Sequence, residues 1–193
     1  MPNFGRFNVK DRDGHWYKFD HQQMMKSCTI ASAKIAKELY YNTSIGEQAL
    51  RGIAALFEKD IENEGVSPLS TQAQNAHNWD NKAGKLKITL HVLKSQPFPI
   101  HSARKEAANK NLLKNANKNH PVLIGWDWER GGGHCTVCVG KTKSDENTVI
   151  ILDPYYGLQY VDLNVLDGGR FVYRPKPNVK GIHYPDDNTF IIT

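Results

Sequence analysis

The chain has 193 residues, of which 39% are hydrophobic and 23% are charged, and its formal net charge at pH 7 is +5. This composition excludes an intrinsically disordered polyelectrolyte, and no run of about 18 apolar residues predicts a membrane span. The three cysteines are too few for a disulfide scaffold, so we expect a reducing compartment. No apolar segment typical of a secretion signal is visible at the N-terminus, so we expect the protein to be cytoplasmic as synthesised.

The predicted elements change from helices to strands along the chain. Alternating apolar residues around Asp13-Gly14 predict a hairpin over residues 1–20, which we interpret as an N-terminal extension. Helices are expected from Ser27, from Ser44, over 71–79 and over 101–118, with a strand over 86–92. Later strands are expected at Pro121–Trp128, His134–Thr142, Asn147–Leu152, Leu158–Leu163, Arg170–Tyr173 and Thr189–Ile192. We therefore expect one α+β domain over 1–193, an N-terminal helical part packed on a C-terminal antiparallel sheet.

The helical periodicity also predicts which faces are buried. In the helix from Ser27, we expect water to reach Lys34, Lys37 and Glu38. In the helix over 101–118, one apolar stripe is formed by Ala108, Leu112 and Ala116, and an opposite basic stripe by Lys110, Lys114 and Lys118. This basic face is local, so we expect no nucleic-acid partner. A solvated face is the favoured interpretation, with phosphate or an acidic protein as alternatives.

Cys28 lies at the start of a predicted helix, a position with chemical consequences. Unsatisfied backbone N–H groups and the positive end of the helix dipole favour a thiolate there. Gln22 and Gln23 precede it, and a side-chain amide in such a place can donate to an oxyanion together with the Cys28 N–H. An isolated cysteine is more commonly a small buried residue, so this segment alone leaves both interpretations open.

His134 and Asp153 occupy the ends of two neighbouring predicted strands. His134 follows three glycines and can exchange a proton near neutral pH. Asp153 ends an apolar strand before Pro154. If the strands pair through the turn near 143–146, Asp153 can accept the Nδ1 proton of His134. Alone, each would be an ordinary surface histidine or turn aspartate, but with Cys28 they supply a nucleophile, a base and an orienting group.

Two other interpretations concern residues near His134. Cys135 and Cys138 have the C-x-x-C spacing of a zinc site, to which His134 would add a ligand. On a strand, however, these cysteines point to opposite faces, so we expect no metal and no other cofactor. Trp126 and Trp128 share one strand face, which fits a substrate cleft or a packed core.

These segments resemble the papain-like cysteine peptidases, specifically the bacterial C39-like branch. That family has a glutamine before an S-C helix start, a GGHxxxxxG strand and an LDPxxG strand end, and the matches here are residues 22–36, 132–140 and 151–157. Departures from the family pattern occur at Thr29-Ile30 and Cys135. With this spacing of the three segments, the resemblance implies the whole papain-like fold from about residue 20 to 175.

The resemblance also implies a role for each matching residue. Cys28 would be the nucleophile, His134 the general base and then acid, and Asp153 the residue that orients His134. Gln22 would be the oxyanion donor, with Gln23 as the fallback if the loop register shifts by one residue.

The activity implied is thiol-dependent hydrolysis of peptide or amide bonds in a protein or peptide substrate. A deamidase or acyltransferase with the same triad is an alternative, and a catalytically silent binding module is another. The resemblance further implies a bacterial effector or processing peptidase. A processing peptidase would act in the cytosol, whereas an effector would be delivered to a target cell or secreted by a dedicated machine and would have an inhibitory or immunity protein as a partner.

Overall fold

The computed structural model describes residues 5–24, 26–41, 46–54, 88–91, 100–183 and 189–192. Its helices are α1 (Cys28–Tyr41), α2 (Glu47–Ala54) and α5 (Ile100–Asn115). Its strands are β1 (Arg6–Lys10), β2 (Trp16–Asp20), β3 (Ile88–His91), β4 (Val122–Trp128), β5 (Gly133–Lys141), β6 (Thr148–Asp153), β7 (Gly157–Asp162), β8 (Leu166–Asp167), β9 (Arg170–Lys176), β10 (Val179–His183) and β11 (Thr189–Ile192). The helix expected over 71–79 lies outside the described residues.

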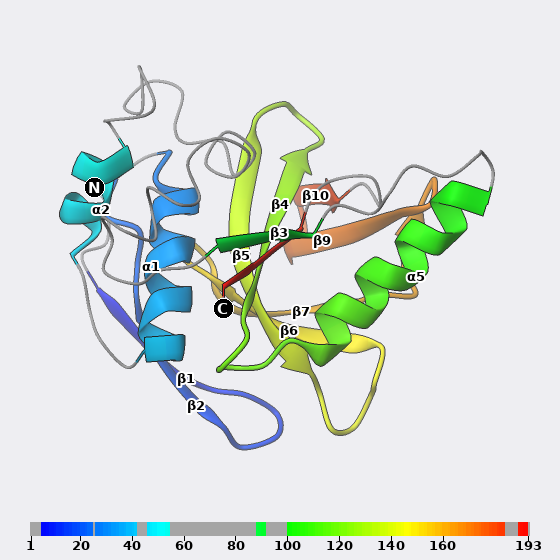
Figure 1. The fold of residues 1–193 in the computed structure, drawn as a ribbon, viewed down its shortest axis with the longest axis horizontal. Coiled ribbons are helices and arrows are strands. Elements are labelled where there is room, and N and C mark those ends of the chain that lie inside the picture. Colours follow the sequence, from blue (N-terminus) through cyan, green and yellow to red (C-terminus); the bar gives the residue numbers. More distant parts are fainter. Residues whose placement is uncertain are drawn as a thin grey trace.

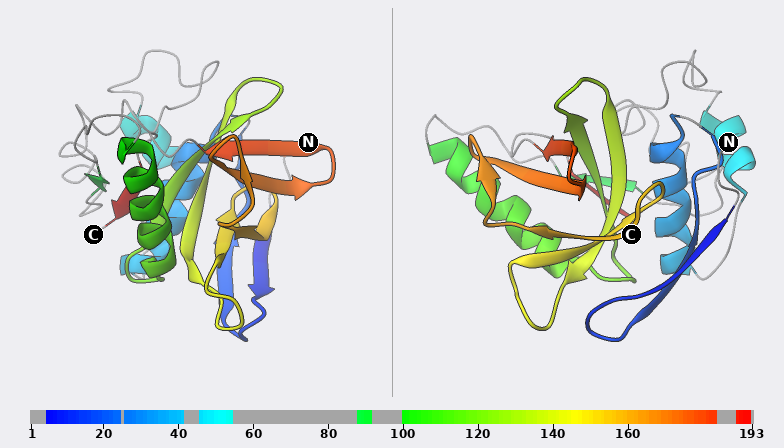
Figure 2. Two further views of the ribbon diagram at one scale, coloured as in Figure 1. Left: turned by 90° about the vertical axis from the view of Figure 1, so that its right-hand side faces the viewer. Right: turned by 180° about the vertical axis from the view of Figure 1, so that it is seen from behind.

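The fold is α+β, with a large antiparallel sheet between helices. The strands run in the order β7-β6-β5-β4-β10-β9-β8, and β11 pairs with β3 and β4. Helices α1 and α5 lie on opposite sides of the central strands (Figures 1 and 2). No helix in the described part of the chain is long and apolar enough to cross a membrane.

Strand alternation divides the interior into two cores, one on each face of the central strands. The first core lies under α1 and includes Cys135, Val137 and Val139 of β5 with Ile150 and Leu152 of β6. The second core lies under α5 and contains the side chains that point to the other face of these strands. Among its residues are Trp126, Cys138, Val149, Ile151 and Tyr173. Successive side chains of a strand point to opposite faces, so the apolar run of β6 serves both cores.

The strand predictions are confirmed for the hairpin strands β1 and β2, for β3 to β7, and for β9 and β11, but β8 and β10 were missed. The sequence of β10, VKGIH, has no clear alternation and contains a glycine. Its position has a packing reason, because a Cβ at Gly181 would lie 3.0 Å from the Trp128 ring and 3.1 Å from Cβ of Trp126. Here a glycine lets a strand approach two tryptophans closely, which local pattern does not reveal.

The expected faces of two helices were wrong in part. Lys34 and Lys37 are buried, with 4% and 5% of their surface exposed, because α1 is covered by the hairpin and α2 as well as by the sheet. The Lys34 amine is paired with Asp20 of β2 and with Glu38, so its charge is matched inside the protein. In α5, Leu113 is buried instead of Leu112, which is only partly buried, whereas Ala116 of the expected stripe, directly after the helix, is buried as predicted.

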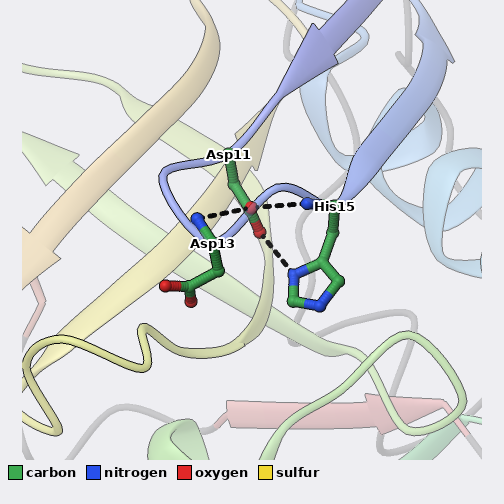
Figure 3. A group of neighbouring side chains, drawn as sticks. All are labelled: Asp11, Asp13 and His15. Carbon is green, nitrogen blue, oxygen red and sulfur yellow. Dashed lines mark hydrogen bonds and ion pairs between the residues drawn. The ribbon is translucent and has the colours of Figure 1, made fainter.

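The hairpin of β1 and β2 is closed by the side chain of Asp11. Its Oδ1 accepts the backbone N–H groups of Asp13 and His15 at 2.9 and 2.8 Å. Its Oδ2 contacts His15 Nδ1 and the Tyr17 hydroxyl, each at 3.1 Å. Figure 3 shows the carboxylate of Asp11 turned into the loop toward Asp13 and His15. An aspartate that caps its own turn is a common way to fix a hairpin.

Candidate active site

Helix α1 begins at Cys28, as the sequence predicts. The Ser27 carbonyl accepts the N–H of Ala31 at 2.8 Å, so Ser27 is the N-cap and Cys28 the first helical residue. The N–H of Cys28 therefore has no acceptor within the helix, and its thiol is half-buried. Cys28 combines a sulfur, an unsatisfied backbone donor and the positive end of a helix dipole.

His134 and Asp153 meet at one end of the sheet. Strands β5 and β6 are antiparallel, so the start of β5 lies beside the end of β6. Nε2 of His134 lies 2.7 Å from Oδ2 of Asp153, and both side chains are buried. The expectation that Nδ1 would face the carboxylate was wrong. The ring is turned so that Nε2 takes that contact, which leaves Nδ1 for the thiol.

The environment of His134 favours its charged form. Burial disfavours an imidazolium and by itself lowers the pKa of His134. Hydrogen bonds with Asp153 and Cys28, and their negative charges, outweigh burial and raise this pKa to about 9. His134 is therefore an imidazolium at neutral pH, held between a carboxylate and a thiol group.

The Asp153 carboxylate uses its two oxygens for different purposes. Oδ1 accepts the backbone N–H groups of Tyr155 and Tyr156 at 2.6 and 2.8 Å, which builds the turn after β6. Oδ2 contacts His134 and accepts the Tyr173 hydroxyl at 2.5 Å. The two interpretations of this residue, turn aspartate and partner of histidine, both describe the structure. Four hydrogen bonds hold the carboxylate in one orientation.

The turn from Asp153 to Gly157 also needs its glycine. Gly157 pairs with Asp153 and has a φ of +79°, in the left-handed region. A Cβ there would lie 2.8 Å from the Phe7 ring of β1. The N-terminal hairpin thus packs directly against the turn that holds Asp153, and only glycine fits between them.

The two glutamines before Cys28 are held in different ways. The backbone N–H of Gln22 donates to the Pro154 carbonyl at 2.8 Å, which puts Gln22 beside the turn after Asp153. Its side-chain Nε2 donates to the Met24 carbonyl at 3.2 Å. Oε1 of Gln22 is buried and has no hydrogen-bond partner among the residues that the structure describes. The backbone N–H of Gln23 instead donates to Glu47 of α2, at 2.9 Å.

Of the aromatic residues at the site, the sequence analysis left the role of Trp128 undecided and missed Tyr173. Trp128 is half-buried and stacks on the His134 ring, with centroids 5.1 Å apart and an angle of 21° between the planes. Trp126 is instead a core residue whose Nε1 donates to Thr136 at 2.8 Å. Tyr173 was not singled out at all, because its contact with Asp153 joins strands that are not neighbours in the sheet. In the sequence, the strand face that Trp126 shares with Trp128 was the only feature that pointed to an aromatic residue of the site.

The structure argues against zinc at the C-x-x-C segment. Cys135 belongs to the first core and Cys138 to the second, on opposite faces of β5. Burial raises the pKa of Cys138 to about 12, and its Sγ lies 3.5 Å from the Leu113 carbonyl. Two thiols on different faces cannot ligate one ion with His134.

Another group has the composition of a metal site. Asp11, Asp13 and His15 each offer a ligand atom within 4.8 Å of the others. Both oxygens of Asp11 already accept hydrogen bonds, as Figure 3 shows for those to Asp13 and His15. Oδ2 of Asp13 accepts the Lys143 N–H at 2.7 Å. These bonds explain the cluster as a hairpin turn docked on the β5–β6 loop.

The expected basic stripe of α5 is partly neutralised. Lys110 pairs with Glu106 at 2.9 Å, and Lys114 donates to Asn147 at 2.7 Å. The second contact ties α5 to the turn between β5 and β6. The structure thus gives two of these lysines partners within the chain, in line with a helix face that meets solvent and neighbouring turns.

One comparison with known proteins gives a match. A family model described as "Papain-like cysteine protease AvrRpt2" matches residues 17–165, more than half of the chain. No curated protein matches the chain. The matched range contains Gln22, Cys28, His134 and Asp153 together with most of the central sheet.

Proposed function

Because the chain belongs to the papain-like cysteine protease family, we propose that it hydrolyses peptide or amide bonds with Cys28, His134 and Asp153 as its catalytic triad. The observation that carries the proposal is the buried Nε2–Oδ2 contact of His134 and Asp153 at 2.7 Å, with Cys28 acting on the same imidazole. The resemblance to papain-like cysteine peptidases is confirmed by the family match. The narrower C39-like branch stays a prediction.

In the proposed mechanism, the imidazolium of His134 pairs with a thiolate at Cys28. The sulfur attacks the carbonyl carbon of the scissile bond, and the carbonyl oxygen becomes an oxyanion. His134 then transfers its Nδ1 proton to the leaving amine, which departs and leaves a thioester on Cys28. Neutral His134 next takes a proton from water, which attacks the thioester and releases the acid.

Asp153 controls which nitrogen of His134 exchanges protons. Its Oδ2 accepts from Nε2–H, so the proton on Nε2 stays in place throughout the cycle. Nδ1 is then the nitrogen that accepts and donates. A fixed carboxylate with four hydrogen bonds keeps the imidazole in this orientation.

We assign the oxyanion donors to the Cys28 N–H and the Gln22 side chain. The helix start leaves the Cys28 N–H without an intrahelical acceptor. Gln22 is anchored beside the Asp153 turn, and one N–H of its amide remains after the bond to Met24. Gln23 is the weaker candidate, since its backbone is bound to α2 instead.

The biological setting is a proposal from the resemblance alone. A protein substrate, a bacterial effector role, delivery to a target cell and an inhibitory partner all fit a small thiol peptidase. Deamidation or acyl transfer would use the same triad, and the products distinguish them: new peptide termini for hydrolysis, ammonia for deamidation.

The proposal is tested with a peptide library analysed by mass spectrometry. Wild-type protein is expected to cleave a defined subset, and Cys28→Ala to cleave none while its melting temperature is preserved. Cys138→Ser is the matched control, because it also replaces one sulfur but in the second core. Cleavage retained by Cys28→Ala would overturn the proposal, and ammonia release without cleavage would replace hydrolysis with deamidation.

A further inference from the structure

The residues just before Cys28 are bound to helix α2 by two charged side chains. Oε2 of Glu47 accepts the backbone N–H of Gln23 at 2.9 Å. Nη1 of Arg51 donates to the Ser27 hydroxyl at 2.5 Å. Gln23 follows the proposed oxyanion donor directly, and Ser27 precedes the proposed nucleophile. These two hydrogen bonds therefore hold both ends of the segment that joins Gln22 to Cys28.

Glu47 and Arg51 are buried although both are charged. Their exposed fractions are 1% and 3%, and they stand four residues apart on one face of α2. Burial raises the pKa of Glu47, while the Gln23 N–H, Ser27 and the charge of Arg51 act in the opposite direction. Apolar residues would bury this face of α2 at lower cost, so its charges point to a task that apolar side chains cannot perform.

The same segment contains an unfavourable backbone conformation. Lys26 has a φ of +62° and is the one non-glycine residue with positive φ in the described part of the chain. A long side chain in the left-handed region persists only where its surroundings enforce it. Gln23 and Ser27, the residues bound to α2, lie on either side of Lys26.

We propose that Glu47 and Arg51 are positioning residues, which hold the strained segment so that the Gln22 amide and the Cys28 N–H point at one substrate oxygen. This inference rests on the proposed hydrolytic function, and it assigns α2 a part in that function. Glu47 and Arg51 touch no reacting atom. They act through the backbone of Gln23 and the side chain of Ser27.

The test compares kcat and KM of Glu47→Ala, Glu47→Gln and Ser27→Ala on a peptide that the wild type cleaves. Glu47→Ala and Ser27→Ala should lower kcat about 10–100-fold with KM nearly unchanged, the scale for small misplacement of catalytic groups. Glu47→Gln should retain most of kcat, because its amide oxygen can still accept the Gln23 N–H.

A second substitution separates positioning from general stability. Lys26→Gly removes the penalty of the left-handed backbone, so it should restore part of kcat when added to Glu47→Ala. The control is Leu113→Ala, which opens a cavity in the second core, far from α2, and should leave kcat per folded molecule unchanged.

Each outcome has a definite meaning. A kcat of Glu47→Ala equal to that of the wild type, or a loss that Lys26→Gly does not relieve, overturns the inference. An equal loss in Leu113→Ala does so as well, since kcat would then follow stability. Failure of the wild type to hydrolyse any amide bond is a different result, which overturns the proposed function itself.

Discussion

The two sides of the candidate site are built by different means. His134 and Asp153 are placed by the antiparallel pairing of β5 and β6, and Asp153 is fixed by four hydrogen bonds. The Gln22 and Cys28 side depends on single contacts with Pro154, Glu47 and Arg51. The register of paired strands is fixed by many hydrogen bonds, whereas the position of a loop depends on the few hydrogen bonds that it makes. Substitutions on the first side should therefore change proton transfer by His134. Substitutions on the second side should change the orientation of the oxyanion donors toward the substrate.

Among the variants that distinguish the two sides, the largest effect is expected from Asp153→Asn, on the rigid side. The Oδ1 position accepts two backbone N–H groups, so the amide oxygen should stay there and the NH₂ group should replace Oδ2. That group donates to Nε2 of His134 and moves the ring proton to Nδ1, the wrong nitrogen for accepting from Cys28. We expect kcat to fall by about 10³–10⁴, the scale known for such a tautomer error.

Melting temperature should also fall in Asp153→Asn, because the Tyr173 hydroxyl loses its acceptor. The control is Asp162→Asn, because Asp162 is an exposed aspartate at the end of β7. A lower melting temperature with turnover per folded molecule unchanged would remove Asp153 from the catalytic set.

A smaller effect is expected from Gln22→Ala, on the loop side. Loss of one oxyanion donor costs about 10²–10³ in kcat, with substrate affinity little changed. Gln23→Ala keeps its backbone N–H and the bond to Glu47, so it should do much less. Steady-state kinetics of both variants decide between the two glutamines, and the opposite ranking would move the oxyanion role by one residue.

The pH dependence tests the charge state of His134. Its pKa in the folded protein is raised from 6.5 to about 9, so the imidazolium persists at neutral pH and is lost above about 9. Turnover should therefore fall as the pH rises through about 9. The stability that the charged pair contributes should be complete below pH 6.5 and disappear over the same rise.

Tyr173→Phe should modestly shift the alkaline limb of the pH profile, that is, the pH range near 9 over which turnover falls. Without the phenol, Oδ2 of Asp153 bonds to His134 alone and attracts the imidazolium more strongly, which raises the limb to higher pH. Turnover at neutral pH should fall only slightly, since three hydrogen bonds still orient Asp153. A limb that does not move in this variant would show that Tyr173 supports the fold without influencing His134.

The smallest effect is expected from Cys135→Ser, next to His134 in sequence. Its side chain faces the first core, away from the imidazole, and burial raises the pKa of this thiol. A buried hydroxyl should lower the melting temperature and leave turnover per folded molecule unchanged. Loss of turnover in the folded variant would reopen a chemical role for the C-x-x-C segment.

Sequence patterns predicted the parts of this protein that depend on local chemistry. The apolar runs of β4 to β7, the helix start at Cys28 and the turn after Asp153 all follow from alternation, capping and the Asp-Pro sequence. The antiparallel pairing of β5 and β6 was enough to bring His134 and Asp153 together. These features need only the order of residues along neighbouring segments.

What the sequence did not predict depends on contacts between distant segments. The burial of Lys34 requires Asp20 of the hairpin, and the Tyr173 contact requires β9 to reach the end of β6. The choice of Nε2 over Nδ1 is a matter of ring rotation, which no sequence pattern specifies. The sequence pattern placed Glu47 only in the first turn of the helix expected from Ser44, and its bond to Gln23 depends on how α2 packs.

The central claim, that Cys28 is poised as a nucleophile by His134, is tested most directly by alkylation. Iodoacetamide is added to the folded protein at pH 5.5, and the modified cysteine is identified and timed by mass spectrometry in the wild type and in His134→Ala. Because the thiolate is the reactive form, the account predicts rapid and selective modification of Cys28 in the wild type, slow modification in His134→Ala, and none at the buried Cys135 and Cys138. Equal and slow modification of Cys28 in both proteins would contradict the account.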